Sequence, residues 1–170
     1  WNDREGWTLP VILNGTVSGG ALWLTIQTEK KDSVKSWRSQ IWGSAPDYML
    51  VSPKELNIPA EQYNNVVIRL RNLSPETDGF ILWQTTDKPG KDTGSVRFTM
   101  KPDCGEWQDV VCHMDSRWKG TIDQIKIIPA QMWQRGDIWI DWIAVTKGEL
   151  KQTGRRPDVC SDNVIPQIHL

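Results

Sequence analysis

The chain has 170 residues, a length that suits one domain of ordinary size with a single core. Its formal net charge is −1 and its pI about 6.2, so global charge does not indicate nucleic acid or an anionic membrane surface as a partner. No apolar run reaches the roughly 18 residues that a membrane-spanning helix needs, and no signal peptide is visible before Trp1. We therefore expect no membrane span and no nucleic-acid partner.

The residue pattern predicts β-structure from one end of the chain to the other. Short segments rich in Val, Ile, Thr and Trp are bounded by Gly, Pro, Asn or Asp, and no segment shows sustained helical periodicity. The predicted strands are residues 21–28, 48–53, 64–72, 79–86, 95–101, 106–114, 122–129 and 137–145. About eight or more strands with turns between them predict an all-β fold, an antiparallel β-sandwich of jelly-roll type.

The predicted domain covers residues 1–147. Residues 148–170 lose the alternation and carry a basic pair and two prolines, which is typical of a tail or linker. The odd number of cysteines leaves at least one free or paired outside the chain. Because a strand is predicted between Cys104 and Cys112, their Cα atoms should exceed the limit of about 7 Å for a disulfide. A pair that involves Cys160 stays open.

Eleven tryptophans stand out beside two tyrosines and two phenylalanines. Most of them should fill the core, but an exposed indole can stack its flat apolar face on the C–H face of a sugar ring. The last predicted strand, in the segment GDIWIDWIAV (136–145), carries Trp139 and Trp142. Regular strand alternation places these two side chains on opposite faces, so at most one can lie in the core.

Several phrases in the second half of the chain form a pattern: GEW at 105–107, WKGTI at 118–122, IKIIP at 125–129 and IDWI at 140–143. They resemble the jelly-roll, galactose-binding-like carbohydrate-binding modules that are appended to bacterial carbohydrate-active enzymes. The resemblance covers roughly residues 1–146, more loosely in the first half, and leaves out the insertion at 30–42. It implies a non-catalytic module that targets a polysaccharide for a covalently linked glycoside hydrolase or related enzyme, in a secreted, periplasmic or cell-surface protein.

The resemblance also implies a structural calcium ion near the last strand. An aspartate at this place in related jelly rolls helps to hold the ion beside the N-terminal segment, which here points to Asp141 with Asp3 or Glu5. Calcium prefers several carboxylate and carbonyl oxygens at about 2.3–2.6 Å. The alternative is an Asp141 that hydrogen-bonds a neighbouring loop.

Strand parity indicates a first candidate binding site. Placing the apolar sets of three strands inside leaves Arg69, Arg71, Trp83 and Arg97 facing outward. If residues 64–72, 79–86 and 95–101 are neighbours in one sheet, these side chains form a patch of guanidinium groups around an indole. Such a patch suits an acidic or sulfated polysaccharide, with Trp on the ring and Arg on the anion.

The same residues allow other interpretations. The arginines could pair with surface acids such as Glu76 or Asp78, and a slip of one residue in register would bury the side chains placed outside. A second candidate site is the insertion, where Trp37, Arg38 and Trp42 precede Tyr48 in a polar, loop-like region. Those indoles could instead fold back against the end of the sandwich.

No pattern of catalytic residues stands out. The motifs G-x-S-x-G and H-E-x-x-H are absent, and no strand shows the E-x-D or E-x-x-E spacing of a catalytic face. The phrase QIH, with His169, resembles one in jelly-roll alginate lyases but lacks the tyrosine strand that accompanies it there. We expect no enzyme. The alternatives are a structural spacer, in which Trp37, Trp42 and Trp83 are covered, and a stand-alone polysaccharide lyase.

Overall fold

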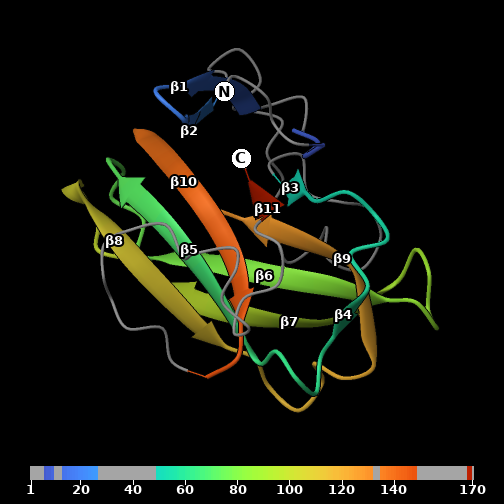
Figure 1. Ribbon diagram of the computed structural model, residues 1–170. Helices are drawn as coiled ribbons and strands as arrows, with labels where there is room; N and C mark the ends of the chain where they lie inside the picture. The colour runs from blue at the N-terminus through green and yellow to red at the C-terminus, as the bar shows by residue number, and fades with distance from the viewer. Residues whose placement is uncertain (1–5, 10–12, 27–48, 132–134, 149–167, 170) are drawn as a thin grey trace.

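The computed structural model of the chain describes residues 6–9, 13–26, 49–131, 135–148 and 168–169. Two antiparallel sheets face each other as two layers, and Figure 1 shows β10, β5 and β8 in front of β6 and β7. The described residues form no helix. The predicted all-β sandwich is confirmed.

The larger sheet has six strands, with β1 and β8 at its edges. Its order is β1-β2-β10-β5-β8, and β11 pairs with β10 beyond the end of β2. The bounds are β1 Leu13–Ser18, β2 Ala21–Ile26, β5 Asn65–Asn72, β8 Cys104–His113, β10 Asp137–Thr146 and β11 Ile168–His169.

The smaller sheet has five strands, and β9 pairs with three of them, β3, β4 and β6. Its order is β3-β9-β6-β7, and β4 also pairs with β9. The bounds are β3 Leu50–Val51, β4 Ile58–Pro59, β6 Asp78–Thr85, β7 Asp92–Thr99 and β9 Thr121–Ile128. All eight predicted strands therefore correspond to observed ones; seven differ only at their ends, and the one predicted at 48–53 is reduced to Leu50–Val51.

The strand β1 was not predicted, and the reason is local. Its Asn14-Gly15 pair has the composition of a turn, yet Gly15 is buried, and an added Cβ there would meet a methyl group of Leu9 at 2.2 Å. The turn itself comes later, at Gly19-Gly20, whose φ angles of 61° and 81° suit a tight hairpin. This hairpin brings β2 alongside β10.

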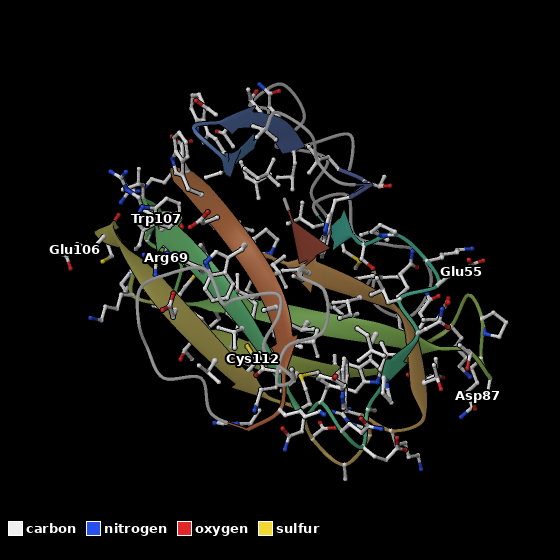
Figure 2. The ribbon with its side chains drawn as sticks, viewed as in Figure 1. Glu55, Arg69, Asp87, Glu106, Trp107 and Cys112 are labelled. Carbon is white, nitrogen blue, oxygen red and sulfur yellow. The ribbon has the colours of Figure 1, made fainter. Side chains whose placement is uncertain are left out.

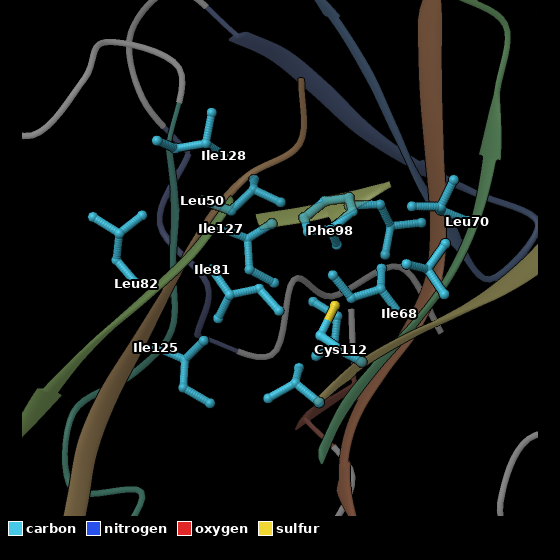
Figure 3. Packing of buried hydrophobic residues seen from close by; sticks show 14 of the residues in the cluster. Leu50, Ile68, Leu70, Ile81, Leu82, Phe98, Cys112, Ile125, Ile127 and Ile128 are labelled. Carbon is cyan, nitrogen blue, oxygen red and sulfur yellow. The ribbon is translucent and has the colours of Figure 1, made fainter. Parts of the chain in front are cut away.

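The core lies between the two sheets. Figure 3 shows Ile68, Leu70 and Cys112 from the larger sheet facing Ile81 and Ile127 from the smaller one. Alternation in β5 therefore works as predicted: Val66, Ile68 and Leu70 point inward, and Arg69 and Arg71 lie on the outer face.

The prediction for Trp83 is wrong. In β6 both alternating sets are apolar, so hydrophobicity alone does not choose between them. Trp83 lies directly opposite Ile125 and is fully buried in the core, with its ring against Gly94. A Cβ at Gly94 would approach the Trp83 ring to 2.2 Å, so the missing side chain makes room for the indole.

A β-bulge overturns the parity expected for the last long strand. The register of β10 on β5 shifts between Ile140 and Trp142, which leaves Asp141 as the extra residue. Trp139 lies opposite Arg71 and Trp142 opposite Arg69, and directly opposed residues share a face. Both tryptophans therefore lie on the outer face, and neither enters the core between the sheets.

The last described residues return to the sandwich. Within the predicted tail 148–170, Ile168–His169 forms β11 and pairs with β10 at Trp142 and Ile143. Cys104 and Cys112 lie near opposite ends of β8 and do not bridge each other, as their strand spacing predicts; both are free, and Cys160 lies outside the described residues.

Candidate functional site

The outer face of the larger sheet gathers aromatic and charged side chains over β2, β10, β5 and β8. We call this surface the indole face and define it by Trp23, Trp139, Trp107, Arg69 and Arg71. On β2, β10 and β5 the members follow from strand alternation, because their neighbours in the strand, such as Leu22 and Leu24 in β2, point into the core. Four strands spaced about 4.8 Å apart make the face about 14 Å wide, enough for an oligosaccharide.

Two indoles pair at one side of this face. Trp23 and Trp139 lie directly opposite each other on β2 and β10, and their rings stack with centroids 5.3 Å apart and planes 4° from parallel. Trp23 remains 38% exposed, which is unusual for so large an apolar side chain. The stack holds both rings in fixed positions and leaves an apolar surface open to solvent.

Arg71 continues the same row on β5, directly opposite Trp139. Its Nε is buried and has no hydrogen-bond partner, and no ion pair to Arg71 is formed within the described part of the chain. Its guanidinium passes over Gly105, where an added Cβ would meet Nη2 at 4.0 Å. The row from Trp23 to Arg71 therefore ends in a cation whose charge the described residues leave uncompensated.

Arg69, two residues earlier on β5, has a different environment. Its Nη1 lies 2.8 Å from Asp109 Oδ1 and its Nε 3.4 Å from Asp141 Oδ2. The guanidinium also lies 5.9 Å from the centroid of the Trp107 ring, a cation–π contact. Figure 2 shows Arg69 and Trp107 together over β5 and β8. The bulge at Asp141 places this second carboxylate beside Arg69.

An open groove of about 870 Å³ begins at this end of the face and follows β8, the edge strand. Trp107 is 38% exposed there, and the groove wall combines its ring with the Arg69–Asp109 pair and the turn at 99–102. The lining is thus partly aromatic and partly charged, which is typical of surfaces that bind polar ring molecules.

The four side chains predicted for one sheet face do not come together. Arg69 and Arg71 lie on the larger sheet, whereas Trp83 and Arg97 belong to β6 and β7 of the smaller sheet. Arg97 is exposed on the outer face there and pairs with Asp78, with Nη2 2.7 Å from Oδ2, which is one of the pairings considered from sequence. The predicted patch is therefore corrected to the two arginines of β5 with different indoles.

The remaining predicted site residues are not tested by the structure. Trp37, Trp42 and Asp3 lie outside the described residues. Asp141 pairs with Arg69, and the described residues bring no three His, Cys, Asp or Glu side chains together as metal ligands. Calcium at Asp141 with Asp3 stays a prediction.

Sequence reasoning missed Trp23 and Trp107 and left the position of Trp139 open. A signal for the first two exists: in ALWLTI and CGEWQDVVCH, Trp occupies the alternate set that also carries Thr25 and Asp109, while the other set carries the core residues. That Trp23 meets Trp139 is a property of the sheet order, which the strand sequences do not show.

The arrangement is suited to binding. Fixed apolar rings alternate with guanidinium donors and carboxylate acceptors, and most of these charged groups already hold one another in place.

Burial raises the pKa of the Cys112 thiol to about 12, so that buried group is a protonated, unreactive thiol at neutral pH. None of the described residues forms a helix long and apolar enough to cross a membrane.

Comparison with known proteins adds to the description of the fold. The sequence matches no protein-family model and no curated protein sequence. Among solved structures, the chain is similar to a carbohydrate-binding module described as CBM4, with 11% identity, a TM-score of 0.51, and 86% of this chain and 90% of that chain covered. It is also similar to part of PfGH50B, with 10% identity, a TM-score of 0.56, and 91% of this chain but 23% of that chain covered. At these identities the likeness concerns the fold, a β-sandwich of the kind found in carbohydrate-binding modules.

Proposed function

We propose that this chain is a non-catalytic carbohydrate-binding module whose ligand lies across the indole face. The observation that carries the proposal is the set of outward, partly exposed indoles on one sheet face, with Trp23 stacked on Trp139 and Trp107 beside Arg69. Indole faces bind the C–H faces of sugar rings, and the charged groups between them can exchange hydrogen bonds with hydroxyl groups. A structural spacer has no need to keep two large rings 38% exposed on one face.

The proposal also concerns the longer protein that contains the module and where that protein is located. Similarity to a segment that makes up 23% of PfGH50B supports a place for this fold within a longer chain. We infer a covalently linked catalytic domain, which a bound polysaccharide would keep close to its substrate by raising the local concentration. Because such a polysaccharide lies outside the cytoplasm, the same proposal implies that this protein is secreted, periplasmic or on the cell surface.

An acidic or sulfated polysaccharide is part of the proposal. The support comes from Arg71, whose guanidinium has no ion pair within the described residues. Guanidinium groups bind carboxylate and sulfate oxygens through paired N–H donors, so this position favours an anionic ligand over a neutral glucan.

Affinity electrophoresis and calorimetry against neutral, uronate-containing and sulfated polysaccharides test the proposal. We expect at least one soluble polysaccharide to bind, and Trp107→Ala and Trp23→Ala to weaken it about tenfold or more, as the loss of an aromatic anchor does. Trp37→Ala and Trp42→Ala are the matched controls. If only those two abolish binding, the site lies in the insertion, and if no polysaccharide binds, the spacer interpretation replaces this proposal.

A further inference from the structure

The two arginines of the indole face differ in charge balance although they are two residues apart on one strand. Arg69 lies 2.8 Å from a carboxylate oxygen of Asp109 and 3.4 Å from one of Asp141. Arg71 has no ion pair among the described residues, and its Nε is buried without a hydrogen-bond partner. An anion that approaches Arg71 meets a cation that no described residue compensates, whereas one that approaches Arg69 meets carboxylates as well.

Each arginine also has its own aromatic neighbour. Arg71 lies opposite Trp139, which is stacked on Trp23, and Arg69 lies under Trp107. We define the first subsite as Trp23, Trp139 and Arg71, and the second subsite as Trp107, Arg69 and Asp109. Two residues of a β-strand span about 7 Å, so the subsites are close enough for neighbouring rings of one polysaccharide chain.

The chemistry of the two subsites favours different rings. At the first subsite, a carboxylate or sulfate can take the free N–H donors of the guanidinium while its ring contacts an indole. At the second subsite, the Arg69–Asp109 pair offers a donor and an acceptor side by side, which suits vicinal hydroxyl groups that both accept and donate. An anionic group there would face the Asp109 carboxylate at close range, and that repulsion disfavours it.

We propose that the indole face selects a polysaccharide in which an anionic sugar is followed by an uncharged one. The anionic ring lies at Trp139 and Arg71, and the uncharged ring lies at Trp107, Arg69 and Asp109. This inference rests on the proposed carbohydrate binding and adds the charge pattern of the ligand. It separates alternating polymers from neutral glucans and also from polymers in which every ring is charged.

The test compares three groups of soluble polymers by calorimetry on the intact protein. The first group alternates charged and uncharged rings (hyaluronan, unsulfated chondroitin, κ-carrageenan), the second is charged at every ring (polygalacturonate, alginate), and the third is neutral (β-glucan, mannan, carboxyl-reduced hyaluronan and chondroitin). We expect the best alternating polymer to bind about tenfold tighter than any member of the other groups, the gain typical of one charge-assisted contact. Equal or tighter binding by a neutral or fully charged polymer overturns the inference but leaves carbohydrate binding intact. If no polymer binds, both proposals fail together.

Variants separate the two subsites. Arg71→Gln should lower the affinity for the best alternating polymer about tenfold and lower the affinity for neutral polymers by a clearly smaller factor, while Arg71→Lys should retain most of the preference. Arg97→Gln makes the same change on the other sheet and should not change the affinity for any polymer. Circular dichroism checks that each variant is folded. An equal loss for charged and neutral ligands in Arg71→Gln overturns the assignment, because a merely structural arginine would behave in that way.

A gain of binding tests the second subsite. Asp109→Asn removes the nearer of the two carboxylates beside Arg69, leaves Asp141 in place and keeps the shape of the side chain. We expect polygalacturonate, which carries an anion on every ring, to bind this variant several-fold tighter than it binds the parent protein. An unchanged or weaker affinity for polygalacturonate shows that Asp109 does not exclude anions, and overturns the charge pattern proposed for the ligand.

Discussion

The outer face of the larger sheet has two halves that share strands but differ in exposure. The indole face is one half, where Trp23 and Trp107 are each 38% exposed. The other half, which we call the covered half, consists of Val67, Trp142, Ala144 and Val111, and its tryptophan is 1% exposed. The strand β10 contributes Trp139 to the first half and Trp142 to the second.

Under the proposed function, one strand contributes to both binding and stability. The bulge at Asp141 separates Trp139 from Trp142 and keeps both on the same side of the sheet. Beyond the bulge the outer face is a small hydrophobic cluster, and before it the face carries stacked, accessible rings. Tryptophans on one face of the same sheet therefore differ in exposure because their surroundings differ, and the following substitutions test whether they also differ in role.

The largest expected effect is on stability, in the covered half. Trp142→Ala removes a buried indole and should lower the free energy of unfolding by about 3–5 kcal/mol, as measured by urea denaturation followed by circular dichroism. Trp142→Phe is the matched control. It keeps most of the volume and removes the buried Nε1, which has no hydrogen-bond partner, so its cost should be smaller. A loss below about 1 kcal/mol for Trp142→Ala would show that this cluster contributes little.

The same substitution in the open half should reverse the balance between stability and affinity. Trp107→Ala truncates a ring that is 38% exposed, so we expect a change in unfolding free energy of less than about 1 kcal/mol. Its affinity for the polysaccharide should fall about tenfold or more. If Trp107→Ala destabilises the protein as much as Trp142→Ala does, the division into two halves does not hold.

Arg69 lies at the boundary of the halves, opposite Trp142 and beside Trp107. Its side chain is 15% exposed and its partner Asp109 13%, so Arg69→Gln leaves a largely buried carboxylate without its nearest cation and should cost about 1–3 kcal/mol. Arg97→Gln breaks an ion pair whose arginine is 58% exposed, and should cost less than about 1 kcal/mol. Thermal unfolding of both variants measures the contrast, and equal losses would contradict it.

The smallest effect concerns the two cysteines of β8, in a Cys160→Ser background. At pH 8 a thiol reagent should modify Cys104 quickly and Cys112 only on unfolding, because burial raises the pKa of Cys112 to about 12. A raised thiol pKa stabilises the folded state fully below the unfolded value of 9.0, and this contribution declines as pH rises from there toward about 12. Rapid modification of Cys112 at pH 8 would show that the core opens at this end of β8.

The sequence alone determined much of the fold. Alternation with a period of two, without helical periodicity, predicted eight strands and a sandwich. In β5 it also placed Arg69 and Arg71 on the outer face, because Val66, Ile68 and Leu70 form one wholly apolar set. The excess of tryptophan also pointed to an aromatic surface. These features are local, so they can be read from neighbouring residues without knowing where the chain goes next.

Only the tertiary structure decided which side chains share the site. The sheet order separates β5 from β6 and β7, and it brings Trp23 against Trp139 from the far end of the chain. In β6, where both alternating sets are apolar, packing against Gly94 turned Trp83 inward. In β10, one bulge residue moved Trp142 to the face of Trp139. Pairing between strands and the position of a bulge depend on contacts between distant segments, and no periodicity within a single strand encodes them.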